Sequence, residues 1–435
     1  MLRFGTDGIR ANADEQLVPS FVRALGVAAA RVLGVSTELL IGRDTRASGP
    51  RIAADLAFGF ESAGGRCRML EVLPTPGIAL RSAQLGVPAA VISASHNPWV
   101  DNGVKFFAAG GLKLSDGQQA AFERELETLL AAEPSPATPQ SVIVHADRIS
   151  VPIAAHAAPD LAAYAEHLEA ALDGRRLDGQ RVVLDVGHGA AFAVAPRVFR
   201  ALGAEVVCLY DAPDGKNINN HCGSTHPEQL QVAVLENHAH LGLAFDGDQM
   251  MVALALDLSD QGQLRGNTLV VTVMSNLGLH IALREAGIAV VETPVGDRQV
   301  MAAMEAGGFV LGGEQSGHVI VRNRATTGDG TLTGLLFADV MARTKRTAST
   351  LAGCMRPLPQ VLVNVRMAAT PDLDAATELW AAVAAESELL GAHGRVLVRA
   401  SGTEPLVRVM VEAPTSTVAQ STADRLADVV RALPF

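Results

Sequence analysis

The sequence predicts an α/β fold in which repeated helix–strand units are followed by a small α+β domain. One local pattern recurs three times, at residues 52–76, 194–213 and 279–296: an apolar helix, a glycine, a short strand and a loop with proline. Units of this kind build parallel α/β sheets. Three copies are consistent with three related α/β domains, although any large α/β protein repeats such units. The length of 435 residues allows two to four domains of about 100–200 residues each.

The C-terminal part has a different order of elements. A break at RPLPQ (356–360) separates it from the repeats, and an earlier loop or linker follows an amphipathic helix predicted over 117–131. The order after the break is β-α-β-β-α, which is typical of a small α+β domain. The predicted elements are a strand at 361–367, a helix at about 371–389, strands at 395–400 and 406–413, and a helix at about 416–432.

Composition excludes several classes of protein. The formal net charge is −11 and the isoelectric point is about 5.6, which disfavours nucleic-acid binding because that affinity needs clustered Lys and Arg. Aromatic residues make up 4%, which argues against stacking platforms for bases or sugars. Hydrophobic residues make up 49%, enough for a sizeable core. An acidic protein that binds small anions must concentrate its cations locally.

No targeting or membrane segment is predicted. The N-terminus carries charges where a signal peptide needs an apolar core, and no run of about 18 apolar residues occurs. The four cysteines are far apart and form no C-x-x-C pair, so we expect neither a zinc site nor a disulfide framework. These observations predict a cytoplasmic protein with reduced thiols. They leave the oligomeric state open.

The most informative segment is VISASHNPWVDNGVKFF (91–107). An apolar strand ends abruptly in small polar residues around Ser95, and such positions after strand ends are where α/β ligand sites form. For these letters alone a capped turn is the better interpretation. A serine hydrolase is a poor one, because Ser95 lacks the G-x-S-x-G elbow. Lys105 either places a cation near this loop or lies on the surface.

Two further segments have the composition expected of ligand-binding loops. Residues 398–409 (VRASGTEPLVRV) offer hydroxyls and backbone N–H groups between two arginines, which suits a phosphate group better than an ordinary glycine turn. The segment GGEQSGH (312–318) is suited to hydrogen bonds with sugar hydroxyl or amino groups, although a flexible polar loop is an equally good interpretation. The candidate phosphate ligands are Arg399, Ser401, Gly402, Thr403 and Arg408, and the candidate sugar ligands are Glu314, Ser316 and His318.

The segment LGLAFDGDQMM (241–251) delivers Asp246 and Asp248 after an apolar strand. Paired carboxylates there suit Mg²⁺, especially beside a phosphate, although a helix cap and a turn give the same letters. A haloacid-dehalogenase-type phosphatase also begins with D-x-D, but it prefers Thr or Val where Met250 stands. A dinucleotide fingerprint is suggested at 181–211, but Phe192 occupies its third glycine position, so nicotinamide binding is not expected.

Taken together, nine ordered motifs resemble the α-D-phosphohexomutase family over nearly the whole length. The motifs are FGTDGIR (4–10), GRDTR (42–46), ASHNP (94–98), DNGVKFF (101–107), PDGKNIN–CGSTHPE (213–228), TPVGDR (293–298), GGEQSGH, TTGDG (326–330) and SGTEP (401–405). Gln315 matches the glucosamine-type version of its motif, where mannose- and glucose-type members usually have Met.

The resemblance implies three related α/β domains plus a C-terminal α+β domain around a central cleft. The implied domains are 1–148 with the phosphoserine loop, 149–248 with the metal loop, 249–357 with the sugar-recognition loop and 358–435 with the phosphate-binding loop. Ser95 would match the serine that carries the phosphoryl group, Lys105 the general acid/base, and Arg10 a cation near the phosphoserine. Ser95, Asp246 and Asp248 would hold Mg²⁺.

The implied activity is interconversion of glucosamine 6-phosphate and glucosamine 1-phosphate through glucosamine 1,6-bisphosphate, for amino-sugar nucleotide and cell-wall precursor synthesis. Glu314, Ser316 and His318 would bind the sugar, and the phosphate loop the distal phosphate. The expected partner is therefore a small phosphosugar, with no nucleic acid and no membrane.

The metal loop departs from the family pattern. The family carries Asp-Gly-Asp-Gly-Asp followed by Arg, then a strand, a turn and a second Asp-Gly-Asp-Gln that opens a helix. Here the two strings are merged at residues 246–248, which points to a deletion that removes the third Asp, the Arg and a core strand. We therefore expect weakened Mg²⁺ binding. The alternative function is a catalytically impaired phosphosugar-binding paralogue or variant.

Overall fold

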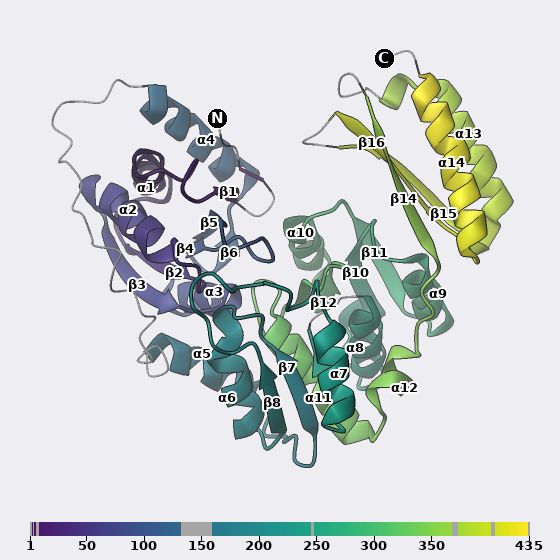
Figure 1. The fold of residues 1–435 in the computed structure, drawn as a ribbon, viewed down its shortest axis with the longest axis horizontal. Helices are drawn as coiled ribbons and strands as arrows, with labels where there is room; N and C mark the ends of the chain where they lie inside the picture. Colours follow the sequence, from purple (N-terminus) through teal and green to yellow (C-terminus); the bar gives the residue numbers. More distant parts are fainter. Residues whose placement is uncertain are drawn as a thin grey trace.

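The computed structural model describes residues 2, 4–5, 8–131, 159–244, 248–367, 373–401 and 405–433. They form three α/β units, which lie side by side, and a fourth unit that stands beyond the third (Figure 1). The predicted fold class is confirmed. No helix in the described part of the chain combines the length and apolarity needed to cross a membrane.

The first unit is a six-stranded sheet with helices on both faces. Strands β2, β3 and β4 are parallel, β5 is antiparallel to β4, and β1 pairs with the other side of β5, also antiparallel. Apolar residues of α1, α2 and α4 pack on one face around Leu25, Leu56 and Phe122. The elements are β1 (Ile9–Asn12), α1 (Pro19–Leu33), β2 (Glu38–Arg43), α2 (Gly49–Ser62), β3 (Arg66–Val72), α3 (Thr75–Leu85), β4 (Ala89–Ile92), β5 (Asp101–Ala108), β6 (Leu112–Lys113) and α4 (Asp116–Ala131).

The third unit repeats the strand order of the first. Its sheet runs β11-β10-β12-β13, in which β13 is antiparallel to β12, just as β3-β2-β4-β5 ends in an antiparallel strand. The elements are α8 (Asp248–Asp260), β10 (Thr268–Thr272), α9 (Leu277–Glu285), β11 (Ala289–Thr293), α10 (Asp297–Gly307), β12 (Leu311–Gly313), β13 (Val319–Val321), α11 (Gly330–Thr344) and α12 (Ala348–Ala352).

The second unit lacks the fourth strand among its described residues. Its sheet is β8-β7-β9, all parallel, and it matches the first three strands of its neighbours. After β9, where the other units continue into an antiparallel strand, the described chain resumes at Asp248 with α8 of the third unit. This arrangement agrees with the deletion inferred from the sequence. The elements are α5 (Pro159–Ala170), β7 (Arg181–Asp185), α6 (Val194–Ala201), β8 (Glu205–Leu209), α7 (Glu228–Glu236) and β9 (Leu241–Leu243).

The three recurring sequence patterns correspond to α2–β3, α6–β8 and α9–β11. In each pair the strand joins its sheet in parallel, as predicted. One continuous apolar core includes buried residues from all three units, among them Leu73, Leu184 and Leu335. The three α/β units are therefore packed as one body.

The C-terminal unit has its own core and confirms the predicted β-α-β-β-α order. Its antiparallel sheet β14-β16-β15 is covered by α13 and α14, around Val409 and Leu426. The elements are β14 (Gln360–Arg366), α13 (Thr377–Leu390), β15 (Arg395–Ala400), β16 (Leu406–Glu412) and α14 (Ser416–Ala432). The α13 helix begins at Thr377 rather than near 371, because a short 3₁₀ turn at Leu373–Ala375 precedes it.

A buried polar junction attaches this unit to the third one. The Asn276 side chain donates to the Leu358 carbonyl (3.0 Å) and to the Glu412 carboxylate (3.1 Å), and it accepts from the Leu358 amide (2.9 Å). Glu412, which is fully buried, also binds Arg395 and the Leu277 amide. Burial raises the pKa of Glu412, an effect that Arg395 opposes.

We predict that Asn276→Ala loosens this junction. The variant loses the cap of α9 and leaves part-buried backbone groups of Leu358 without the Asn276 side chain, a cost of about 2–3 kcal/mol. Calorimetry should show an earlier unfolding transition, and proteolysis should cut first near 358. The control is Thr347→Ala, which removes the exposed cap of α12 and should cost about 1 kcal/mol or less. Equal effects of the two variants would contradict this role of Asn276.

Candidate functional site

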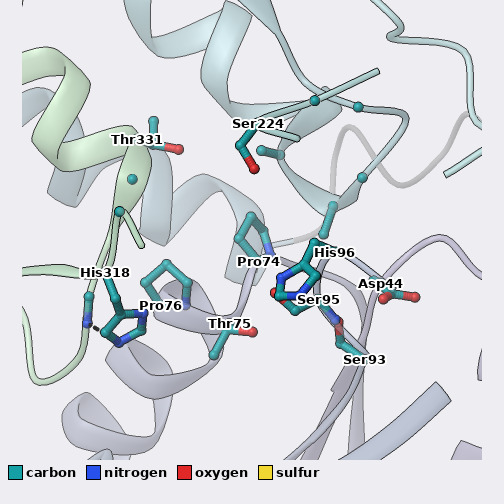
Figure 2. A pocket seen from close by; sticks show the side chains of 18 of the residues that line it. Asp44, Pro74, Thr75, Pro76, Ser93, Ser95, His96, Ser224, His318 and Thr331 are labelled. Atoms are coloured by element: carbon teal, nitrogen blue, oxygen red, sulfur yellow. Dashed lines mark hydrogen bonds between the residues drawn. The ribbon is translucent and has the colours of Figure 1, made fainter. Parts of the chain in front are cut away.

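A cavity of about 470 Å³ lies where loops of the three α/β units meet. Six of the predicted site residues line it: Arg10, Ser95, Lys105, Glu314, Ser316 and His318. Figure 2 shows Ser95 and His96 on one side of the cavity, His318 on another, and Ser224 and Thr331 from two further elements. The prediction that residues from distant parts of the sequence share one site is supported by this arrangement.

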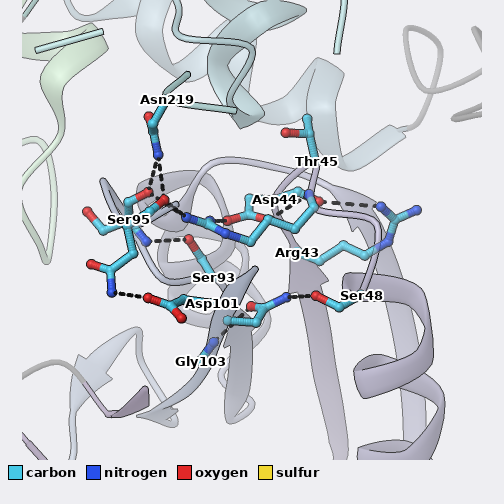
Figure 3. A network of polar contacts seen from close by, with 12 residues as sticks. Arg43, Asp44, Thr45, Ser48, Ser93, Ser95, Asp101, Gly103 and Asn219 are labelled. Atoms are coloured by element: carbon cyan, nitrogen blue, oxygen red, sulfur yellow. Dashed lines mark hydrogen bonds and ion pairs between the residues drawn. The ribbon is translucent and has the colours of Figure 1, made fainter. Parts of the chain in front are cut away.

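Ser95 is exposed on the loop between β4 and β5 and has a left-handed backbone, with φ of 55°. A non-glycine residue in this conformation costs about 1–2 kcal/mol and needs support from its surroundings. The support is a set of hydrogen bonds. The Ser95 amide donates to Ser93 Oγ (3.0 Å), and the Ser95 carbonyl accepts from Asn219 Nδ2 (2.8 Å) and Arg46 (3.1 Å) (Figure 3).

Arg46 holds the Ser95 loop in place. Its side chain is fully buried, forms an ion pair with Asp44, and donates to the carbonyls of Ser95 and Asn97. The planar guanidinium can satisfy several acceptors in fixed directions, which an ammonium group cannot do. Sequence reasoning gave Arg46 and Asn219 no role, although GRDTR and PDGKNIN were recognised as motifs.

The strand β5 approaches the Ser95 loop closely because residue 103 is glycine. A Cβ atom there would lie 2.7 Å from the Ile9 carbonyl oxygen and 2.8 Å from that of Ser93. The Gly103 carbonyl accepts the Ser93 amide at 3.1 Å. Lys105, two residues further on and 14% exposed at its side chain, consequently lies in the same cavity.

The second unit contributes a buried carboxylate, Asp185, at the end of β7. It accepts the amides of Gly187 and Gly223, each at 2.9 Å, and so shapes the loops that carry Asn219 and Ser224. Burial raises the pKa of Asp185, while these two backbone hydrogen bonds lower it. Asp329 at the start of α11 is buried in the same way, and burial raises its pKa as well.

The loop between β12 and β13 delivers Glu314, Ser316 and His318. Glu314 Oε1 accepts the Gly296 amide (3.0 Å), and the imidazole Nε2 of His318 lies 3.1 Å from the Gly328 amide. This loop occupies the same place in the third unit that the Ser95 loop occupies in the first, between a parallel and an antiparallel strand.

The two predicted metal-loop carboxylates and two residues of the phosphate loop are not placed at the cavity. Asp248 does not line the cavity: its carboxylate accepts the Asn276 amide (2.8 Å) at the base of the C-terminal unit. Asp246, Gly402 and Thr403 lie outside the described residues. Within the described ranges no three His, Cys, Asp or Glu side chains form a group that could hold a metal ion. Because Asp246 lies outside the described residues, the predicted Mg²⁺ site at Ser95, Asp246 and Asp248 stays a prediction.

The predicted phosphate ligands of the C-terminal unit lie away from the cavity. Arg399 and Arg408 are direct partners on β15 and β16, and Ser401 is buried at the end of β15. Burial, and then the charge of Arg408, lower the pKa of Arg399, so an anion would relieve the repulsion between the two. None of the three lines the cavity in this arrangement.

We predict that Arg46→Met destabilises the first unit by about 3–5 kcal/mol, because it leaves the buried Asp44 carboxylate without its ion-pair partner. Chemical denaturation followed by fluorescence or circular dichroism measures the loss. In the control, Arg31→Met removes the exposed ion pair with Glu125 and should cost less than about 1 kcal/mol. A loss below 1 kcal/mol for Arg46→Met would show that the buried pair is not needed.

The comparisons with known proteins cover nearly the whole chain. Four phosphoglucomutase/phosphomannomutase family models match in order: alpha/beta/alpha domain I at residues 1–133, domain II at 162–256, domain III at 246–358 and the C-terminal domain at 362–429. The matches to domains II and III overlap at 246–256. One short segment is therefore matched both as the end of domain II and as the start of domain III.

Curated relatives are similar over nearly their full length. The chain is 47% identical to phosphoglucosamine mutase of Rhodococcus jostii over 450 residues, covering 98% of both chains. It is also 47% identical to phosphoglucosamine mutase of Moorella thermoacetica over 432 residues, covering 94% of this chain and 95% of the relative.

Solved structures share the fold. A phosphoglucomutase/phosphomannomutase family protein from Burkholderia thailandensis has a TM-score of 0.76 at 22% identity, with 98% of this chain and 97% of that chain covered. N-acetylphosphoglucosamine mutase of Aspergillus fumigatus, in complex with GlcNAc-6P and magnesium, has a TM-score of 0.69 at 17% identity, with 99% and 96% covered.

Proposed function

The chain belongs to the phosphoglucomutase/phosphomannomutase family, and we propose that it interconverts glucosamine 6-phosphate and glucosamine 1-phosphate through a phosphorylated Ser95. The observation that carries the proposal is the supported, exposed Ser95 in a cavity that also contains Lys105 and Arg10. Near full-length similarity to phosphoglucosamine mutases favours this function over a phosphosugar-binding paralogue without activity.

The proposed reaction transfers one phosphoryl group from Ser95 to the sugar and a second one from the sugar to Ser95. The bond between Ser95 Oγ and phosphorus breaks, a bond forms to the free C1 or C6 hydroxyl of the sugar, and Lys105 accepts the hydroxyl proton. The resulting glucosamine 1,6-bisphosphate turns over in the cavity. Its other phosphoryl group then returns to Ser95, Lys105 gives back the proton, and the isomer is released.

The remaining cavity residues bind the substrate in this proposal. Arg10 supplies positive charge beside the transferring group, and Glu314, Ser316 and His318 contact the sugar hydroxyls and amino group. We propose that the C-terminal unit approaches the cavity when the substrate is bound, so that Arg399, Ser401 and Arg408, with the neighbouring Gly402 and Thr403, hold the distal phosphate. The polar junction at Asn276, without a shared apolar core, suits such a movement.

The proposed location is the cytoplasm. All four cysteines lie within the described residues and none forms a disulfide. Burial raises the pKa of the Cys67 and Cys208 thiols to about 12, so these thiols stay protonated and unreactive at neutral pH.

We predict that Ser95→Ala abolishes turnover. A coupled assay with glucosamine 1-phosphate, a trace of the 1,6-bisphosphate and Mg²⁺ should give full activity for the unsubstituted chain and none above background for the variant. Ser62→Ala on the outer helix α2, where the hydroxyl bonds only to the Gly59 carbonyl among described residues, is the matched control and should retain activity. Turnover by Ser95→Ala, or none by the unsubstituted chain, would refute the proposal.

We further propose that Mg²⁺ binds this chain more weakly than its relatives. Support comes from the missing fourth strand in the described part of the second unit and from the position of Asp248 beside Asn276. With one carboxylate ligand fewer, affinity should fall about tenfold or more. Titration with Mn²⁺ followed by electron paramagnetic resonance, beside the Rhodococcus jostii relative, measures the difference. Equal affinities would contradict the proposal.

A further inference from the structure

Asp297 has no assigned role, yet it lies where the first and third units meet. It is the first residue of α10, it lines the cavity, and its side chain is 6% exposed. A buried carboxylate is retained at such a position only when cations or hydrogen-bond donors compensate the loss of hydration.

Three side chains that can carry positive charge surround the Asp297 carboxylate. Lys113 pairs with Oδ1, while the His318 Nε2 lies 2.9 Å and the Lys105 Nζ 4.0 Å from Oδ2. Lys105 and Lys113 belong to β5 and β6 of the first unit, and His318 belongs to the sugar loop of the third. Asp297 therefore joins the proposed acid/base to the sugar loop through one charge.

The His318 Nε2 atom lies near the Thr327 hydroxyl, at 3.4 Å, and near two other groups with opposite requirements. The Gly328 amide, 3.1 Å from Nε2, needs a lone pair on that nitrogen, whereas Asp297 Oδ2 needs a proton there. Addition of a proton to Nε2 would reverse the preference toward Asp297.

The glycine at 328 is required for this arrangement. A Cβ atom at that position would lie 2.5 Å from the His318 ring, so no other residue lets the backbone amide approach Nε2 so closely. The His318 ring is thus held between an amide donor and a carboxylate, where its protonation decides which of the two it binds.

The residues beside Asp297 strengthen the same link. The Gly296 amide donates to Glu314, and Arg298 donates to the Leu114 carbonyl of the first unit and pairs with Asp116. The turn at 296–298 therefore contacts both the sugar loop and the strand region that carries Lys105. The charged groups that face this turn within the described residues are Lys105, Lys113, His318, Glu314 and Asp116, and Arg10 lines the same cavity.

We propose that Asp297 is a positioning residue that holds Lys105 in place and that controls the proton on His318, so that the acid/base and the sugar loop respond to each other. The inference rests on the proposed function for the role of Lys105. The contact between Asp297 and His318 is independent of it. By Coulomb's law a carboxylate 4 Å or less from both groups favours their charged forms.

The test is Asp297→Asn, which keeps the shape of the side chain and removes its charge. Kinetics should show kcat lower by about 10- to 100-fold, the loss typical of removing a supporting carboxylate, with KM little changed. The dependence of kcat on pH should also differ from that of the unsubstituted chain, because the charge beside Lys105 and His318 is gone. Nitrogen-15 spectra of the histidine rings, assigned with His318→Gln, should show that His318 loses its proton at lower pH in the variant than in the unsubstituted chain.

The matched control is Asp160→Asn. Asp160 is equally buried and also holds two cations, Arg68 and Arg81, but it does not line the cavity. This variant should lower the melting temperature and leave the pH profile and the His318 titration unchanged. If Asp297→Asn likewise changes only stability, the inference is overturned.

The ring titration separates this inference from the proposed function, because it uses the resting protein. A chain without mutase turnover in which Asp297→Asn still shifts the His318 titration would refute the function and support the contact. An active enzyme in which Asp297→Asn changes neither the His318 titration nor the pH profile would support the function and refute the inference about Asp297.

Discussion

The apolar core shared by the three α/β units is the constraint on which the site depends. Leu73, Leu184 and Leu335 belong to one buried cluster, so the units cannot move apart without exposing it. In the first and third units the loop between a parallel strand and its antiparallel neighbour points into the common cavity, with Ser95 on one loop and Glu314 and His318 on the other. Packing of like units thus converts residues more than 200 positions apart in sequence into one site.

The second unit breaks this internal symmetry at the position where a third such loop would be expected. Its described sheet ends at β9, and the next described element is α8 of the following unit. Asp248, at the start of that helix, binds the Asn276 amide and so belongs to the attachment of the C-terminal unit. The family models for domains II and III overlap at residues 246–256, so the end of one domain and the start of the next are matched to the same segment. The Asp248 carboxylate therefore contacts the junction through the Asn276 amide in this structure.

Much of the fold could be predicted from local patterns, and the support of the site could not. The helix–glycine–strand units and the bounds of β15 and α14 follow from apolar periodicity and turn residues. Ser95 was predictable because it follows a strand end. Arg46, Asn219 and Asp297 act through tertiary contacts with residues 49, 124 and 21 positions away, on Ser95 and His318. Local spacing carries no signal for such pairs, although the motifs that contain these residues were visible.

The central claim is that Ser95 carries the phosphoryl group. Its most direct measurement is the intact mass of the purified chain before and after incubation with glucosamine 1,6-bisphosphate, followed by peptide mapping. The account predicts one added phosphoryl group, located on Ser95 and absent from the Ser95→Ala variant treated in the same way. An unmodified chain under all these conditions, or a phosphoryl group on another residue, would contradict it.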